Sequence, residues 1–184
     1  NHYKANLRDV QFNLFEFYKI QDEFLGKAPF AAMDEDTVGE ILKTFSKFCA
    51  EELAKSFSAD DKTPLVLDDE GNVKIPSGLS EALGKFYDND WHRIEQPESL
   101  GGYGSPATLK WSCFEFMVGA NPPMSFYLLG NFEASIIDAL GTESQKARFV
   151  KGLADKRWGG TMVLTEPDTG SDVGAGRAKA KHIE

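Results

Sequence analysis

The sequence predicts a mainly α-helical fold, with sustained strand character only near its C-terminus. Apolar residues recur at spacings of three and four in successive segments up to about residue 156. After that point the apolar run Met162–Leu164 is typical of a buried strand, and the loop Thr165–Asp172 follows it directly. We therefore expect an N-terminal extension helix in residues 1–33 and an orthogonal or up-and-down helical bundle in residues 34–156. Residues 157–184 should hold the first strand and loop of a truncated β domain.

The composition is that of a folded and well-packed protein. Of the 184 residues, 41% are hydrophobic and fourteen are phenylalanine, which argues against disorder. A net charge of −9 and a pI near 4.9 make nucleic acid an unexpected partner, because the surface would repel phosphates. No apolar run approaches the roughly 18 residues of a membrane span. No signal-peptide pattern opens the chain, so a cytoplasmic location is expected.

Two helices are expected in the first third of the chain. The apolar-rich segment 9–20 predicts a helix of about three turns. Thr37-Val-Gly-Glu40 has the form of a capping box, in which the threonine accepts a hydrogen bond from a helix amide and the glutamate reaches back. The helix that it opens should bury one amphipathic face, formed by Val38, Ile41, Leu42, Phe45, Phe48, Cys49, Leu53 and Phe57.

A short hairpin is expected next. Residues 65–67 and 73–75 are the two apolar arms, and the turn between them contains a glycine. The turn is acidic, but it lacks the alternating oxygen ligands and the closing glutamate of a calcium loop, so a solvated turn is favoured. Pro76-Ser77 then starts a helix that runs to about Asp88.

A glycine-rich loop precedes the following helix. Residues 97–104 contain no lysine and follow no apolar strand, so by themselves they indicate a phosphate-binding loop only weakly. Ser105 and Pro106 are expected as the N-cap and the first residue of a helix that Asn121-Pro-Pro ends.

The last two helices are expected close together in sequence. Residues 124–140 should form one long apolar helix, in which Gly130 and Ala134 permit a neighbour to approach closely. Thr142–Gln145 is a second capping box, and it opens a final helix to about Ala154.

Residues with catalytic or metal-binding chemistry are scattered along this chain. His2, His92 and His182 are isolated, and none stands at metal-ligand or triad spacing, so structural roles are favoured. Cys49 and Cys113 lie in helical patterns far apart, which indicates buried thiols in a reducing compartment rather than a disulfide. No complete catalytic set and no metal site are therefore expected.

The loop after the expected strand is the best candidate binding site. Thr165 and Ser171 offer hydroxyl groups, and the loop offers free amides, to a polar ligand held at the strand end. Ser171 does not lie in the Gly-x-Ser-x-Gly elbow of a hydrolase, so it is a poor nucleophile candidate. Glu166 could be a general base, but we favour a role in which its carboxylate holds the loop by accepting backbone amides.

Four short motifs occur in order in the second half of the chain: Pro97-Glu-x-x-Gly101-Gly-x-Gly104, Gly141-Thr-Glu-x-Gln145-Lys, Leu153-Ala-x-x-x-Trp158 and Thr165-Glu-Pro-x-x-Gly170-Ser171-Asp172. In this order they resemble the N-terminal half of acyl-CoA dehydrogenases, over about residues 75–184. The helices at 6–20 and from Asp36 resemble the longer N-terminal extension of one bacterial branch of that family.

The resemblance implies an FAD enzyme that oxidises acyl-CoA to 2-enoyl-CoA in fatty-acid β-oxidation. On this resemblance Thr165 would meet the flavin ring edge near N5, and Met162 and Leu164 would flank the flavin. Met162 departs from the aromatic residue often found at its position. Ser171 would bond the flavin pyrophosphate or the CoA arm.

The helix at 124–140 would line the acyl channel, with Ser125 and Leu128 as candidate substrate contacts. The family's catalytic glutamate lies on a C-terminal helical domain outside this chain, so the isolated chain is expected to be inactive. Electron-transfer flavoprotein or another acceptor, and a homo-oligomeric assembly, are the implied partners. Two alternatives stay open: an acyl-CoA oxidase of the same fold, and a non-catalytic helical module for association or ligand binding.

Overall fold

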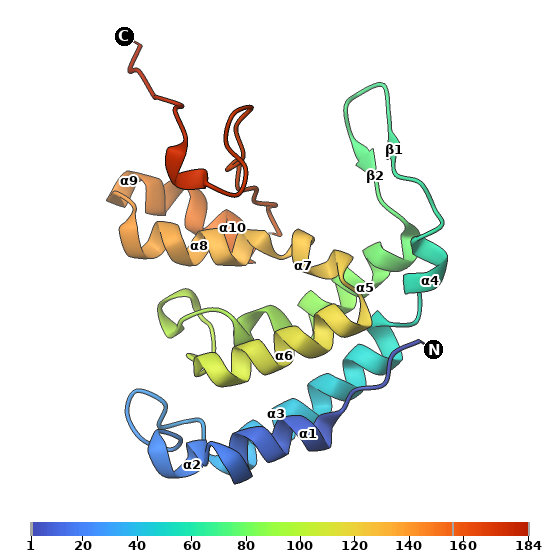
Figure 1. Ribbon diagram of the computed structural model, residues 1–184, viewed down its shortest axis with the longest axis vertical. Coiled ribbons are helices and arrows are strands. Elements are labelled where there is room, and N and C mark those ends of the chain that lie inside the picture. The colour runs from blue at the N-terminus through green and yellow to red at the C-terminus, as the bar shows by residue number, and fades with distance from the viewer. Residues whose placement is uncertain (1, 156, 184) are drawn as a thin grey trace.

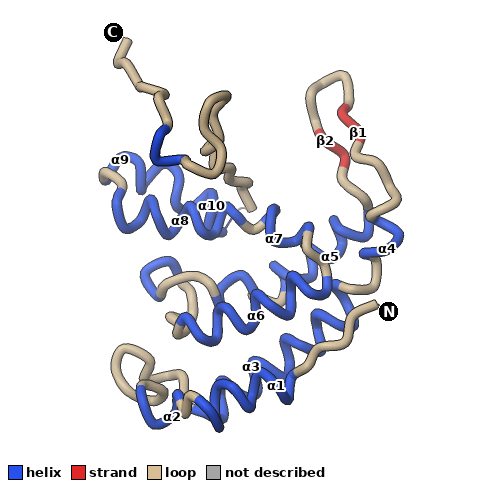
Figure 2. The backbone as a smooth tube through the Cα atoms, viewed as in Figure 1, coloured by secondary structure: helices blue, strands red, loops and turns tan. Residues whose placement is uncertain are grey.

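The helices stack in three levels, from α1–α3 at one end to α7–α10 at the other (Figure 1). This computed structural model describes residues 2–155 and 157–183. Lys156, where a domain boundary is expected, lies outside the described residues, as do Asn1 and Glu184. A small hairpin and the C-terminal segment both project from the helical body, on the side of α7–α10 (Figure 2). No helix among the described residues is long and apolar enough to cross a membrane.

The first helical stretch ends at Phe17, before the end of the apolar pattern that predicted a helix to residue 20. It consists of α1 (Leu7–Gln11) and a π-helical continuation (Phe12–Phe17), and a separate turn, α2, covers Ile20–Glu23. Lys19 between them has a left-handed backbone with φ of 50°. The prediction of one helix to residue 20 is therefore wrong at its end, because an L-residue with positive φ cannot continue a right-handed helix.

The long amphipathic helix begins before its expected capping box. It is α3 (Glu35–Phe48), followed by a π-helical stretch over Cys49–Leu53. Asp34 is the N-cap, and its Oδ1 accepts a hydrogen bond from the Thr37 amide at 2.8 Å. Thr37 lies inside the first turn, so its assignment as N-cap is wrong. Asp34 caps the helix because it stands three residues before an amide that would otherwise lack a partner.

The expected hairpin forms, and all its strand residues are exposed. After α4 (Phe57–Asp60), β1 (Val66–Leu67) pairs antiparallel with β2 (Val73–Lys74). Asp68 Oδ1 accepts hydrogen bonds from the amides of Glu70 and Asn72, at 3.0 and 2.7 Å. The carboxylate therefore organises the turn itself, in agreement with a solvated turn.

The central helices follow the predicted pattern except at one cap. Helix α5 covers Ser77–Asp88, 3₁₀ turns cover Trp91–Ile94 and Glu98–Leu100, and α6 covers Ala107–Ala120. Ser105 was expected as the N-cap of α6, but Pro106 holds that place with an extended ψ of 150°. Ser105 is buried, one residue too early to reach the first amides of the helix.

The expected long helix at 124–140 is broken in two. Helix α7 covers Pro123–Tyr127 and α8 covers Leu129–Leu140, with Leu128 at φ −99° and ψ 1° between them. Met124 and Leu128 belong to the main core, whereas Ala134 belongs to a second cluster with residues of α10. The break lets each half pack against its own neighbours.

The second capping box is confirmed. Thr142 caps the turn α9 (Glu143–Gln145), its amide donates to Gln145 Oε1 at 2.8 Å, and its hydroxyl accepts from the Gln145 amide. A π-helical stretch (Lys146–Val150) and α10 (Lys151–Asp155) complete the helix.

Thr142→Ala is expected to lower the free energy of unfolding by about 1 kcal/mol, because it leaves the first amides of this helix without their cap. Urea denaturation followed by circular dichroism measures the change. Thr161→Ala, in an exposed segment without regular secondary structure, is the matched control and should have almost no effect. Equal effects of the two variants would contradict the capping role.

Two groups of buried side chains form the interior. The larger joins the first helices to α3, α5, α6 and α7, and its fully buried members include Val38, Leu42, Phe86, Leu109 and Phe116. The smaller contains Ala134, Leu153 and Ala154, where α8 packs on α10. The helices preceding residue 34 therefore share the main core rather than forming one of their own.

The expected burial of the strand at Met162–Leu164 is wrong in this chain. Met162, Val163 and Leu164 are 57%, 89% and 52% exposed, and they belong to no strand. A strand needs a neighbouring strand to pair its backbone, and the described residues provide none beside this run. A 3₁₀ turn over Val173–Ala175 is the one helical feature of the described residues after 157.

Candidate functional site

The loop that follows Leu164 folds on itself through its own backbone. Glu166 and Thr169 form an antiparallel bridge, with N–H···O distances of 3.0 and 3.1 Å between their amides and carbonyls. Thr169 is 5% exposed, so the bridge turns this side chain inward while the residues around it stay exposed. The proline and aspartate between them form the tip of a tight turn, as the Pro167-Asp168 sequence favours.

The Glu166 carboxylate ties this turn to the residues that follow. Its Oε2 accepts a hydrogen bond from the Arg177 amide at 2.7 Å, and its Oε1 accepts one from the Ala178 amide at 3.0 Å. These two backbone donors lower the pKa of Glu166, since they stabilise the charged form. The interpretation of Glu166 as a residue that holds the loop is therefore confirmed, and both of its oxygens are already engaged.

The candidate ligand-binding residues of the loop lie on its surface. Thr165 and Ser171 are exposed, and neither hydroxyl makes a hydrogen bond to another residue in the described part of the chain. Met162 and Leu164 expose apolar side chains just before them. The segment therefore offers apolar side chains and hydroxyl groups to a ligand from its exposed surface.

The two candidates on the helices differ in their surroundings. The Ser125 hydroxyl donates to the Pro122 carbonyl at 2.8 Å, so its first hydrogen bond serves α7 itself. Leu128 is 4% exposed and packs in the main core at the break between α7 and α8. No hydrogen bond between described residues joins either of them to the loop.

Close packing against α8 and α10 positions the chain that leads into the loop. The Trp158 amide donates to the Gly152 carbonyl at 3.2 Å. A Cβ at Gly152 would collide with the Trp158 ring, and a Cβ at Gly130 would collide with the Trp158 carbonyl. Both glycines are therefore required for this approach, as the sequence indicated for Gly130. Arg157 adds an ion pair with Asp88 at 2.9 Å.

A buried amide network under this segment was not anticipated. Gln96 is fully buried, and its Nε2 donates to Asn131 Oδ1 at 3.2 Å and to the Ala154 carbonyl at 3.1 Å. It therefore links the loop after α5 to both α8 and α10. The only signal in the sequence was a polar pair, Glu95-Gln96, directly after Ile94.

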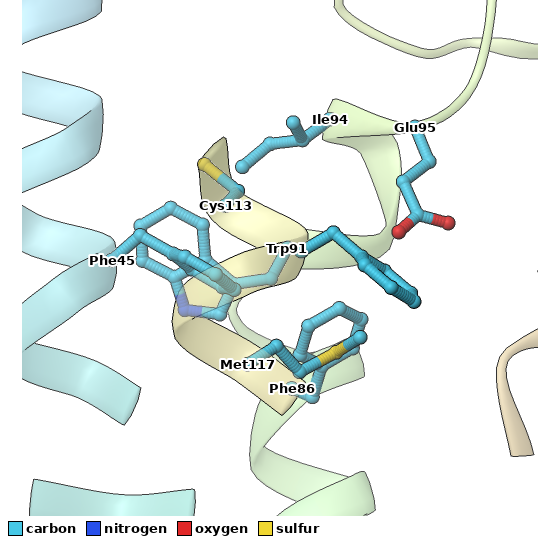
Figure 3. A pocket seen from close by; sticks show the side chains of 8 residues that line it. Phe45, Phe86, Trp91, Ile94, Glu95, Cys113 and Met117 are labelled. Atoms are coloured by element: carbon cyan, nitrogen blue, oxygen red, sulfur yellow. The ribbon is translucent and has the colours of Figure 1, made fainter. Parts of the chain in front are cut away.

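Glu95 borders a small cavity in the main core. The cavity measures about 10 Å³, the size of roughly one water molecule. Figure 3 shows the indole of Trp91 beside Phe45, and the Glu95 side chain on the opposite side of the view. Burial raises the pKa of Glu95 to about 7, and the positive charge of Lys110 opposes that rise. The cavity is lined by Phe45, Phe86, Trp91, Ile94, Glu95, Cys113, Phe114 and Met117.

The two cysteines and His92 lie in packed surroundings. Cys49 and Cys113 are free, buried thiols, and burial raises the pKa of each. His92 is buried with its ring centroid 4.7 Å from that of Tyr87, and desolvation lowers its pKa. Among the described residues, no group of three or more histidine, cysteine or acidic side chains could hold a metal ion.

Comparisons with known proteins agree with the motifs and the helical fold. The family model for the acyl-CoA dehydrogenase N-terminal domain matches residues 35–157. A broad-specificity linear acyl-CoA dehydrogenase of Mycobacterium tuberculosis is 39% identical over 181 residues, which are 98% of this chain and 29% of that protein. A 3-methylmercaptopropionyl-CoA dehydrogenase of Ruegeria pomeroyi is 32% identical over 97% of this chain and 30% of its own length.

The chain thus spans less than a third of the length of these two relatives. The isovaleryl-CoA dehydrogenase of Arabidopsis thaliana is 24% identical over 82% of the chain. Because the family model covers most of the chain and its motifs occur in the family's order, this chain belongs to the acyl-CoA dehydrogenase family and corresponds to its N-terminal helical part.

Proposed function

We propose that this chain forms one wall of the flavin and acyl-CoA site of an acyl-CoA dehydrogenase. Residues 34–156 would be the helical domain, and residues 157–184 would begin the β domain that holds the flavin. The enzyme would convert acyl-CoA to 2-enoyl-CoA, in keeping with the acyl-CoA substrates that the names of its relatives carry.

The observation that best supports this proposal is the exposed surface of the segment 162–171. Thr165 and Ser171 are exposed on this loop, Met162 and Leu164 precede them with exposed side chains, and Glu166 holds the loop through the Arg177 and Ala178 amides. These residues fit one side of FAD: Met162 and Leu164 would flank the ring system, and Thr165 would donate to its edge. Ser171 would bind a phosphate of the flavin or of CoA.

A bound flavin supplies the acceptor for a hydride from a saturated carbon, which no protein side chain provides. This chain's own residues would orient the ligands and cover part of the site. Ser125 and Leu128 would contribute to the acyl channel from the junction of α7 and α8. Electron-transfer flavoprotein or another acceptor would take the electrons, and a homo-oligomer is the proposed assembly.

Thr165→Ala tests this function in the dehydrogenase that contains this segment. We expect kcat/KM to fall about tenfold or more, because a hydrogen bond to the reacting cofactor is lost. The free energy of unfolding should change by less than about 0.5 kcal/mol, since Thr165 is exposed. Steady-state kinetics with an acyl-CoA substrate and thermal denaturation give the two values.

Thr161→Ala, four residues earlier and also exposed, is the control and should leave both values unchanged. Activity of Thr165→Ala equal to that of the unmodified enzyme would contradict the assigned flavin contact.

A further inference from the structure

A single carboxylate closes the loop that carries Ser171 and that directly follows Thr165. Glu166 accepts hydrogen bonds from amides that lie 11 and 12 residues further along the chain. The other hydrogen bonds within the described loop are local, such as those from Ala175 to Asp172 and from Gly176 to Val173. The ends of the loop are therefore brought together by the Glu166 side chain and not by a strand ladder.

The residue at 176 allows the carboxylate to reach these amides. A Cβ at Gly176 would lie 3.0 Å from Glu166 Oε1, which is closer than a carbon atom and a charged oxygen normally approach. A side chain at this position would push the carboxylate by a few tenths of an ångström. Gly176 thus leaves room for the Glu166 carboxylate at the base of the loop.

Thr165 directly precedes Glu166, and Ser171 lies at the middle of the segment that Glu166 closes. Fixing both ends of this segment restricts the positions that the two hydroxyls can take relative to each other. Ligand binding then requires less ordering of the loop, because its conformation exists beforehand.

We propose that Glu166 is a positioning residue for the flavin and acyl-CoA site, acting through the backbone of Arg177 and Ala178 without touching the ligand. This inference rests on the proposed function of the loop. Its carboxylate oxygens are engaged with amides, so it sets the loop geometry and does not accept a proton from substrate.

Amide hydrogen exchange of this chain, measured by NMR, tests the closure without any ligand. In Glu166→Ala the Arg177 and Ala178 amides should exchange about tenfold faster or more, because each loses a charged acceptor. Glu166→Gln should give an intermediate increase, because its amide keeps one acceptor oxygen and turns a donor towards the second amide. Asp168→Ala, an exposed carboxylate of the same loop, is the control and should leave the exchange unchanged.

Flavin content tests the positioning in the purified holoenzyme. Glu166→Ala should retain several-fold less FAD than the unmodified enzyme with the same unfolding midpoint, and Glu166→Gln should restore part of it. Unchanged exchange of the two amides would overturn the closure, and faster exchange with full flavin retention would overturn the positioning role. An unmodified holoenzyme that holds no flavin would instead refute the proposed function, and the role of Glu166 with it.

Discussion

Phe86→Ala is expected to lower the free energy of unfolding by about 3–5 kcal/mol, which is a large part of the stability of a typical domain. The Phe86 side chain is 2% exposed and packs edge-on against Phe45, with 6.2 Å between ring centroids. It also lines the small core cavity, so its removal would enlarge an existing void between α3, α5 and α6. Such a void cannot collapse easily where three helices already pack on it.

Chemical denaturation of the purified chain measures this loss. Phe126→Ala is the matched control, because Phe126 is 71% exposed, and it should change the free energy of unfolding by less than about 0.5 kcal/mol. If Phe86→Ala cost no more than Phe126→Ala, the main core would not be packed as described.

Glu95→Gln is expected to remove a pH dependence from the stability of the fold. Burial raises the pKa of Glu95 from 4.5 to about 7 in the folded chain. Between these two values the folded state binds a proton that the unfolded state has lost, so the contribution of Glu95 falls as the pH rises. Below about pH 4.5 that contribution is fully present, and above about pH 7 it is lost. The difference amounts to about 3 kcal/mol.

Glutamine resembles the protonated acid in shape and carries no charge. At pH 8 we therefore expect Glu95→Gln to unfold at a higher denaturant concentration than the unmodified chain, whereas at pH 4 the two should unfold alike. Denaturation midpoints at several pH values give the comparison. Asp69→Asn, at the exposed hairpin turn, is the control and should leave the pH profile in place. If the denaturation midpoints of Glu95→Gln and of the unmodified chain changed with pH in the same way, ionisation of Glu95 would not destabilise the folded state.

Short-range signals predicted the local structure well where the interacting residues are neighbours in sequence. The Thr142–Gln145 capping box and the Asp68 turn both form, since their partners lie within four residues. The Thr37 capping box was predicted wrongly. Asp34, three residues earlier, caps α3 instead, and the position of a helix end is poorly determined by local sequence.

The interruption at Leu128 has a different cause. Residues 124–140 are mostly apolar, and local propensity favours one helix there. Helix α7 packs with the main core and α8 packs on α10, so the break depends on two separate sets of neighbours. The spacing of apolar residues in the sequence does not show that the helix is divided at Leu128.

For the candidate site, the residues of the loop were proposed from the sequence, and the role of Glu166 in holding the loop was predicted correctly. Gln96 was missed because its partners, Asn131 and Ala154, lie 35 and 58 residues away. Glu95 was missed for a related reason. Its pKa depends on burial beneath helices that are distant in sequence.

The sequence by itself therefore determined the helical class, the family and the loop at Thr165–Asp172, because periodicity, caps and short motifs are encoded within a few residues. Only the tertiary structure decided which polar residues are buried, where the helices break and that Met162–Leu164 is exposed. These properties depend on which distant segments cover a residue, and a strand or a buried carboxylate takes its character from the neighbours that surround it.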